Sequence, residues 1–406
     1  MKMNKRALNS LYITQFLSAF SDNMSLLVIA SLLSENGFSP ESLALVTMAF
    51  FLPYILLAPL VGPFADKLPK SVVLVVGNLI KLFGIIGLIF VDHSSIVLLM
   101  LCYFTVGVGA VVYSPAKYGI LPDLTTNDQE LFKANSRIEA YTILAILAGI
   151  GGGGVIVSMT TTIQSSIICA VLYGLSICVT FLIPRIQGNP SIRYAKEASR
   201  FFNSISLLLK NPKTNFSLIG TGAFWMSSAV LRTAVLAWIP ISLGFDPKDF
   251  NVSLILATTS VGIIIGAFMA PRLIQLRFFH KSIIYGFLML VLILIFPWIH
   301  VTAITIAFLL AVGFMGGVFI VPMNTVLQEE GTRMVGAGKT IAVQNFFENI
   351  LMLIGSGLYY FVVEKGVSIS MAIVIQGLIM LLFLAYLSLQ IQQNKSKLVP
   401  VESTHS

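Results

Sequence analysis

Residues 71–91 read SVVLVVGNLIKLFGIIGLIFV, and Lys81 is the one charged side chain in that run. A helix that crosses a bilayer needs roughly 20 mostly apolar residues, and it satisfies every backbone polar group within its own segment. The run therefore predicts a transmembrane helix. Similar runs occur along the whole chain, and we predict twelve spanning helices near 8–33, 42–64, 71–91, 95–121, 133–158, 164–184, 215–244, 251–275, 281–299, 301–327, 338–362 and 368–392.

The composition of the 406-residue chain excludes an ordinary soluble domain. Hydrophobic residues make up 57% and charged residues 10%, whereas about 25% of a soluble domain is charged. The net charge of +8 does not indicate a nucleic-acid partner, because the basic residues lie in short loops between apolar runs. The first run, 8–33, is too long for a cleaved signal peptide, so we expect it to be retained as a helix.

The sequence predicts no cofactor and no metal site. Cys102, Cys169 and Cys178 lie within apolar runs and show neither metal-ligand nor disulfide spacing. Residues 149–154, GIGGGG, formally fit the dinucleotide-binding pattern GxGxxG, but no strand precedes them. Glycines inside a membrane helix indicate close packing or a hinge instead.

The basic residues predict the orientation of the chain. With the N-terminus in the cytoplasm, twenty of the 25 Lys and Arg residues fall in cytoplasmic segments, and two, Lys248 and Lys365, fall outside. Three more, Lys81, Lys117 and Arg232, lie within helices. This bias follows the positive-inside rule, so we expect a multi-pass membrane protein with both termini in the cytoplasm.

A polar, basic segment near the middle of the chain separates two sets of six predicted helices. We expect a six-helix half at 1–188, a cytoplasmic linker at 189–212, a second half at 213–393 and a cytoplasmic tail at 394–406. YSPAKYGIL at 113–121 and FIVPMNTVL at 319–327 echo each other at corresponding places of the two halves. Two parallel six-helix halves are typical of the major facilitator fold.

The loop after the second predicted helix reads GPFADKLPK at 62–70. It resembles the major facilitator signature GxxxD(R/K)xGR, with Pro69 and Lys70 as departures. We expect Gly62 to allow a close helix approach, Asp66 to cap and pair across the two halves, and Lys67 and Lys70 to stay in the cytoplasm. The loop is therefore a candidate for conformational gating.

Four ionisable residues within helices are the main candidates for a binding site: Asp22, Lys117, Arg232 and Glu348. A charge at the bilayer centre costs roughly 2.5–3.5 kcal/mol. The four residues could offset this cost as ion pairs that lock the halves together, or they could line a central cavity and bind a charged headgroup. Lys81 has no clear role in either interpretation.

Polar side chains near these four strengthen the binding interpretation. Gln344 and Glu348 are four positions apart and so share one helix face. The other polar candidates are Asn23, Tyr113, Asn324 and Asn345.

Four segments carry a resemblance to a known family: QFLSAFSDN (15–23), YSPAKYGILPDL (113–124), KANSRIEA (133–140) and VGAGKTIAVQNFFEN (335–349). Together they resemble the lysophospholipid transporter family of the major facilitator superfamily, over about residues 15–386. The resemblance implies a protein that moves lysophospholipids, notably lysophosphatidylethanolamine, to the cytoplasmic leaflet of the bacterial inner membrane. We expect the protein to be a monomer. It also implies a separate acyltransferase/acyl-carrier-protein synthetase as functional partner. The family's motif charges fall on Asp22, Lys117, Arg232 and Glu348.

The residue chemistry suits such a substrate. Arg232 offers a bidentate fork for a phosphate, Lys117 is a second cation, and Asp22 or Glu348 can take an ammonium group. An acyl chain needs apolar surface, and 29 phenylalanines supply it.

Two other functions remain open from the sequence. One is a proton-coupled symporter or an exporter of a small soluble solute on the same fold. The other is a membrane-embedded lipid-modifying enzyme, against which the absence of HExxH and GxSxG motifs argues. We therefore predict a transporter that is not an enzyme and has no catalytic residues.

Overall fold

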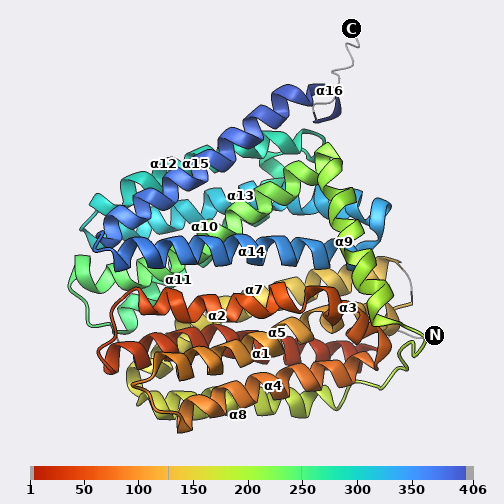
Figure 1. Ribbon diagram of the computed structural model, residues 1–406, viewed down its shortest axis with the longest axis horizontal. Coiled ribbons are helices and arrows are strands. Elements are labelled where there is room, and N and C mark those ends of the chain that lie inside the picture. The colour runs from red at the N-terminus through yellow and green to blue at the C-terminus, as the bar shows by residue number, and fades with distance from the viewer. Residues whose placement is uncertain (1–3, 127, 248, 399–406) are drawn as a thin grey trace. The chain divides into compact units, whose positions relative to one another are not determined.

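The structure is a computed structural model that describes residues 4–126, 128–247 and 249–398. Over these residues the regular structure is helical, with no strand. The chain divides into two compact units, whose helices can be followed in Figure 1. Unit 1 comprises Met1–Arg200 with Asp246–Leu254, and unit 2 comprises Phe201–Phe245 with Ile255–Ser406.

Long apolar helices make up both units. Those of the first unit are α1 (Lys5–Glu35), α2 (Ser42–Leu56), α3 (Ala58–Lys67), α4 (Lys70–Phe90), α5 (Ile96–Gly119), α7 (Asp128–Met159) and α8 (Thr162–Thr180), with the short α6 (Leu121–Leu124). Those that follow are α10 (Pro212–Leu243), α11 (Phe250–Leu273), α12 (Ile283–Ile295), α13 (Thr302–Val335), α14 (Ala337–Glu364) and α15 (Ile369–Gln393), with the short η1 (Leu276–Ser282), η2 (Phe296–Trp298) and α16 (Lys395–Leu398).

The number of spanning helices agrees with the prediction from sequence. Among the described residues, eleven helices are long and apolar enough to cross a membrane, and the bent pair α2–α3 gives up to twelve. The protein is therefore an all-helical, multi-pass membrane protein.

The predicted helix at 42–64 is in fact two helices. α2 and α3 meet at Leu57 with a bend of 62°. Pro59 lies at the start of α3, where its missing N–H cannot continue the hydrogen-bond ladder of α2. The prediction of one helix at 42–64 overlooked this proline.

The predicted linker also contains a helix that was not predicted. α9 (Tyr194–Lys210) is a helix with a buried stripe formed by Phe201, Ser204 and Leu208. In unit 2 the Phe201 ring meets Phe346 edge-on, with 5.5 Å between the ring centroids. The segment is therefore packed structure and not a simple polar loop.

Glycines bring the helices of unit 1 into close contact. A Cβ added at Gly109 on α5 would lie 2.4 Å from the Gly77 carbonyl oxygen on α4, and one at Gly84 would lie 2.7 Å from the Cys102 carbonyl oxygen. No side chain larger than hydrogen fits at such contacts, so α4 and α5 pack backbone to backbone. This packing fixes the position of the Lys81 side chain.

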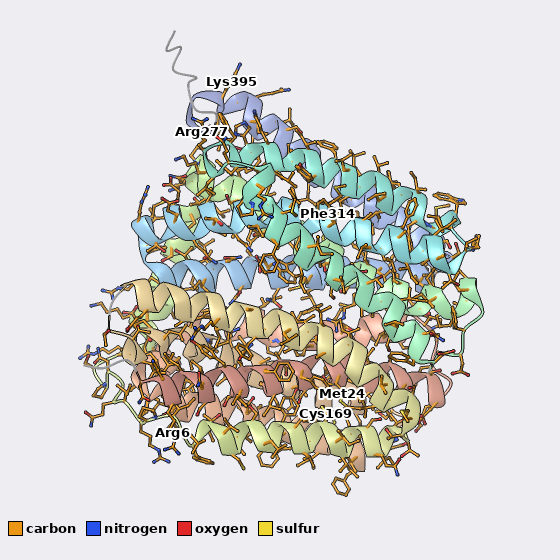
Figure 2. The ribbon with its side chains drawn as sticks, turned by 180° about the vertical axis from the view of Figure 1, so that it is seen from behind. Arg6, Met24, Cys169, Arg277, Phe314 and Lys395 are labelled. Carbon is orange, nitrogen blue, oxygen red and sulfur yellow. The ribbon has the colours of Figure 1, made fainter. Side chains whose placement is uncertain are left out.

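The glycine run of α7 has the packing role that its sequence indicated. A Cβ at Gly149 would lie 2.7 Å from the Phe20 carbonyl oxygen on α1, and one at Gly153 would lie 3.0 Å from Met24 Cβ. α8 closes on α1 as well, since the Cys169 thiol reaches the Ser21 carbonyl oxygen at 3.5 Å. Figure 2 labels Met24 and Cys169 in this part of unit 1.

Candidate functional site

A buried ion pair joins α1 to α4 in unit 1. Lys81 Nζ lies 2.7 Å from Asp22 Oδ2. The Tyr173 hydroxyl on α8 donates to the other carboxylate oxygen, Oδ1, at 2.6 Å. Both carboxylate oxygens therefore have a donor, and three helices meet at this group.

Hydrogen bonds extend the ion pair into a chain that crosses the same three helices. Lys81 Nζ also donates to Ser18 Oγ at 3.0 Å, and Ser18 donates to Asn78 Oδ1 at 2.7 Å. The Asn78 amide donates to Ser176 Oγ at 2.9 Å, and Ser176 donates to the Thr14 carbonyl oxygen at 2.9 Å. Buried polar groups of this kind need such partners, and here they hold α1, α4 and α8 in one register.

Aromatic rings surround the lysine. Lys81 Nζ lies 4.9 Å from the centroid of the Tyr113 ring and 5.8 Å from that of Tyr173. Each ring face attracts a nearby cation. The Lys81 side chain is 2% exposed and the Asp22 side chain 23%, so the carboxylate is the open member of the pair.

The structure thus brings together two of the predicted site residues, Asp22 and Tyr113, because both contact Lys81. The sequence alone had indicated no role for Lys81. The cation that pairs with Asp22 is Lys81. This pair lies within unit 1, where it joins α1 to α4.

The two remaining candidates of unit 1 lie on the same helices. Lys117 is buried near the end of α5, with Nζ 4.3 Å from the centroid of the Tyr118 ring. Asn23 is half-buried next to Asp22, and its side-chain amide donates to the Ala19 carbonyl oxygen at 2.8 Å.

A second polar cluster lies in unit 2 around Glu348, which is 6% exposed. The Gln344 amide donates to Glu348 Oε1 at 2.8 Å and to Asn324 Oδ1 on α13 at 2.9 Å. The Thr221 side chain on α10 also hydrogen-bonds the Glu348 carboxylate. The expected shared face of Gln344 and Glu348 is confirmed.

The two acids have different partners. In the part of the chain that the structure describes, no salt bridge involves Glu348, so its known partners are the neutral amide and hydroxyl groups of Gln344 and Thr221. Asn345, one position after Gln344, is half-buried, and its carbonyl oxygen accepts from the Asn349 side chain at 2.8 Å.

Arg232 lies on the same helix as Thr221 and is half-buried. The spacing from Thr221 to Arg232 corresponds to about three helical turns, so both side chains leave α10 on one side, about 16 Å apart along its axis. α14 packs on this side: a Cβ at Gly222 would lie 2.5 Å from Leu351 Cδ1. Arg232 and Glu348 therefore lie at different heights along the axis of α10.

Residues 62–70, predicted as a loop, are mostly helical, since 62–67 belong to α3 and α4 begins at Lys70. They contact the segment that follows α8. The Asp66 carbonyl oxygen accepts from the Asn189 N–H at 2.9 Å, and Lys67 Nζ lies 4.8 Å from the centroid of the Tyr194 ring. Lys70 forms an ion pair with Asp123 at 3.3 Å. The contacts of Asp66 and Lys67 thus join the end of α3 to the beginning of the linker.

The expected close helix approach at Gly62 is not seen among the described residues, where a Cβ added at Gly62 would have no atom within 4 Å. The close contact is at Gly188, where a Cβ would lie 2.5 Å from the Lys67 carbonyl oxygen. Sequence reasoning missed Gly188 because the motif directs attention to the glycine at its start.

Comparison with known proteins identifies the superfamily of the chain. The Major Facilitator Superfamily profile matches residues 11–356, so the chain belongs to the major facilitator superfamily. Its fold is similar to that of the nucleoside transporter NupG, with a TM-score of 0.73 and 13% identity over 95% of this chain and 99% of that one. A mutant of NupG gives a TM-score of 0.75 with 14% identity over the same shares.

Closer relatives specify the branch of the superfamily. The chain is 38% identical to the lysophospholipid transporter LplT of Photorhabdus laumondii over 90% of both chains. It is 40% identical to LplT of Pectobacterium carotovorum over 90% of this chain and 88% of that one, and 39% identical to LplT of Salmonella paratyphi B over 88% of both. These relatives are transporters and not enzymes, and the chain belongs to their family, as its sequence resemblance indicated.

Proposed function

We propose that this protein transports lysophospholipids across the bilayer. The observation that carries the proposal is the 38–40% identity, over about nine tenths of the chain, to proteins named lysophospholipid transporters. Buried polar clusters in an otherwise apolar helical protein support it, because ionisable groups within a membrane commonly mark a substrate path.

The finer proposal concerns substrate, direction and partner. Lysophosphatidylethanolamine is the expected substrate, moved by alternating access to the cytoplasmic leaflet of the bacterial inner membrane for reacylation by a separate acyltransferase/acyl-carrier-protein synthetase. The placement of both termini in the cytoplasm rests on the bias of Lys and Arg between loops.

The unit 2 geometry suggests how a headgroup is handled. Arg232 suits the phosphate, because its planar fork can donate two parallel hydrogen bonds. Glu348 suits the ammonium, because its known partners are neutral donors. Arg232 lies about 16 Å along the axis of α10 from Thr221, the α10 residue beside Glu348, and only an ethylene bridge separates phosphate from ammonium in the substrate. One headgroup is therefore too short to contact Arg232 and Glu348 at the same time, and it binds them one after the other.

A transport assay with purified protein in vesicles tests the function. Lysophosphatidylethanolamine and lysophosphatidylglycerol should each move faster in the presence of the protein, with protein-free vesicles as control. Repeating the assay with and without a proton gradient shows whether movement is coupled to protons. Movement of neither lipid above the control rate would reject lysophospholipid transport and favour a soluble solute.

A further inference from the structure

The two acids within the apolar helices, Asp22 and Glu348, offer different amounts of negative charge to a ligand. Lys81 Nζ lies 2.7 Å from Asp22 Oδ2, and Tyr173 donates to Oδ1. The Asp22 site is therefore an internally neutralised ion pair. Glu348 has the neutral donors Gln344 and Thr221 as its known partners.

A substrate ammonium would gain little at Asp22. At hydrogen-bond distance from this carboxylate it would also lie close to the Lys81 ammonium, and repulsion between the two cations would cancel much of the attraction. The cost of taking the ammonium out of water would remain. The same ammonium at Glu348 meets no such opposing charge among that residue's known partners.

Lys81 cannot readily turn away from Asp22. A Cβ at Gly109 would lie 2.6 Å from Lys81 Cγ, so the aliphatic part of the side chain is held against α5. Its Nζ is further fixed by Ser18 at 3.0 Å and by the Tyr113 ring. The lysine is 2% exposed, whereas the Asp22 side chain is 23% exposed, so a ligand can approach the carboxylate but not the lysine.

We infer that Lys81 is a specificity-determining residue. Its ammonium occupies the position beside the Asp22 carboxylate where a substrate cation would otherwise bind, so that a headgroup ammonium is recognised by Glu348. This inference rests on the proposed lysophospholipid transport and refines it. It predicts that Asp22 contributes equally to the transport of ethanolamine and glycerol headgroups. It also predicts that removing Lys81 turns Asp22 into a second ammonium site.

The test compares transport of lysophosphatidylethanolamine and lysophosphatidylglycerol, normalised to folded protein, in vesicles. Lys81→Met should lower glycerol transport more than ethanolamine transport, shifting their ratio by roughly threefold, because the substrate ammonium can replace the missing lysine. Lys81→Arg restores the cation and should return the ratio toward that of the parent. A purely structural lysine would not move this ratio.

The double variant Asp22→Asn/Lys81→Met covers the case in which Lys81→Met does not fold. It removes both charges together, and it should keep the parent ratio while lowering both rates. Gln376→Leu is the matched control: Gln376 donates to Ser227 at 3.1 Å in a buried contact between α10 and α15, and its loss should affect both lipids alike.

Two results would overturn the inference. One is an equal loss for both lipids in a folded Lys81→Met variant. The other is a double variant whose ratio of ethanolamine to glycerol transport is lower than that of the parent, since Asp22 would then bind the ammonium itself. A parent protein that moves neither lipid would instead overturn the proposed function, and this inference with it.

Discussion

Lys81 and Asp22 are 59 positions apart in the sequence and 2.7 Å apart in the structure. The contact lies between α4 and α1, and its lysine is almost completely buried. Breaking a buried ion pair by removing one partner commonly costs about 3–5 kcal/mol, because the remaining charge stays buried without compensation. This relationship gives the first prediction.

Asp22→Asn should lower the thermal stability of the purified protein in detergent, because it leaves Lys81 without a carboxylate. Asp22→Asn/Lys81→Met should recover most of the loss, since no unpaired charge remains. Thermal unfolding followed by size-exclusion chromatography measures both variants. Additive losses in the double variant would contradict a direct coupling of the two residues.

The partly exposed ion pair between Lys70 and Asp123 is the control for this experiment. Its side chains are 19% and 32% exposed, and such pairs contribute about 0–1 kcal/mol. Lys70→Met should therefore change the unfolding midpoint much less than Asp22→Asn does.

The packing of α4 on α5 makes Gly109 intolerant of substitution. Gly109→Ala places a methyl group 2.4 Å from the Gly77 carbonyl oxygen and 2.6 Å from Lys81 Cγ, so the helices must separate and the lysine must shift. We expect a lower unfolding midpoint and a loss of transport. Gly151→Ala on α7 is the control, because its Cβ would have no atom within 4 Å. Equal behaviour of the two variants would argue against backbone packing at Gly109.

Gly62, which begins the signature motif, and Gly188, which contacts it, should respond differently to substitution. Gly62→Ala should leave the yield of folded protein unchanged, because open space surrounds its Cβ, whereas Gly188→Ala should lower it through the contact with the Lys67 carbonyl oxygen. Fluorescence-detected chromatography of fusion proteins measures both yields. If Gly62→Ala folds normally but transports poorly, Gly62 approaches a helix in another conformation of the transport cycle.

Arg232 gives a prediction about the phosphate. Arg232→Ala should lower lysophospholipid transport by roughly tenfold or more, since hydrogen bonds to charged groups contribute about 1.5–3 kcal/mol. Arg232→Lys should restore it only in part, because an ammonium cannot reproduce the planar fork. Arg272→Ala, at the exposed end of α11, is the control. Full transport by Arg232→Ala at equal folded yield would reject phosphate binding.

The helical fold could be predicted from sequence because its signals are local. Each spanning helix is a run of apolar residues of membrane length. The errors lie where a second local signal was overlooked: Pro59 divides the helix predicted at 42–64, and the buried stripe of α9 repeats at Phe201, Ser204 and Leu208.

The site could be predicted only where its contacts lie within one helix. Gln344 and Glu348 are one turn apart, so their contact follows from helix geometry. The partner of Lys81 did not follow, because it lies on another helix and helix pairing is not encoded by periodicity. A useful signal was nevertheless present: Gly77 and Gly84 flank Lys81 at a spacing of about two turns, which indicates a tightly packed helix face.

The order in which Asp22 and its partners are synthesised has a consequence for membrane insertion. The ribosome makes Asp22 59 residues before Lys81 and 151 residues before Tyr173. During that interval α1 carries a carboxylate without its cation, at a cost of roughly 2.5–3.5 kcal/mol if it enters lipid alone. We therefore expect α1 to stay beside the insertion machinery until α4 emerges, so that the two helices enter the bilayer together.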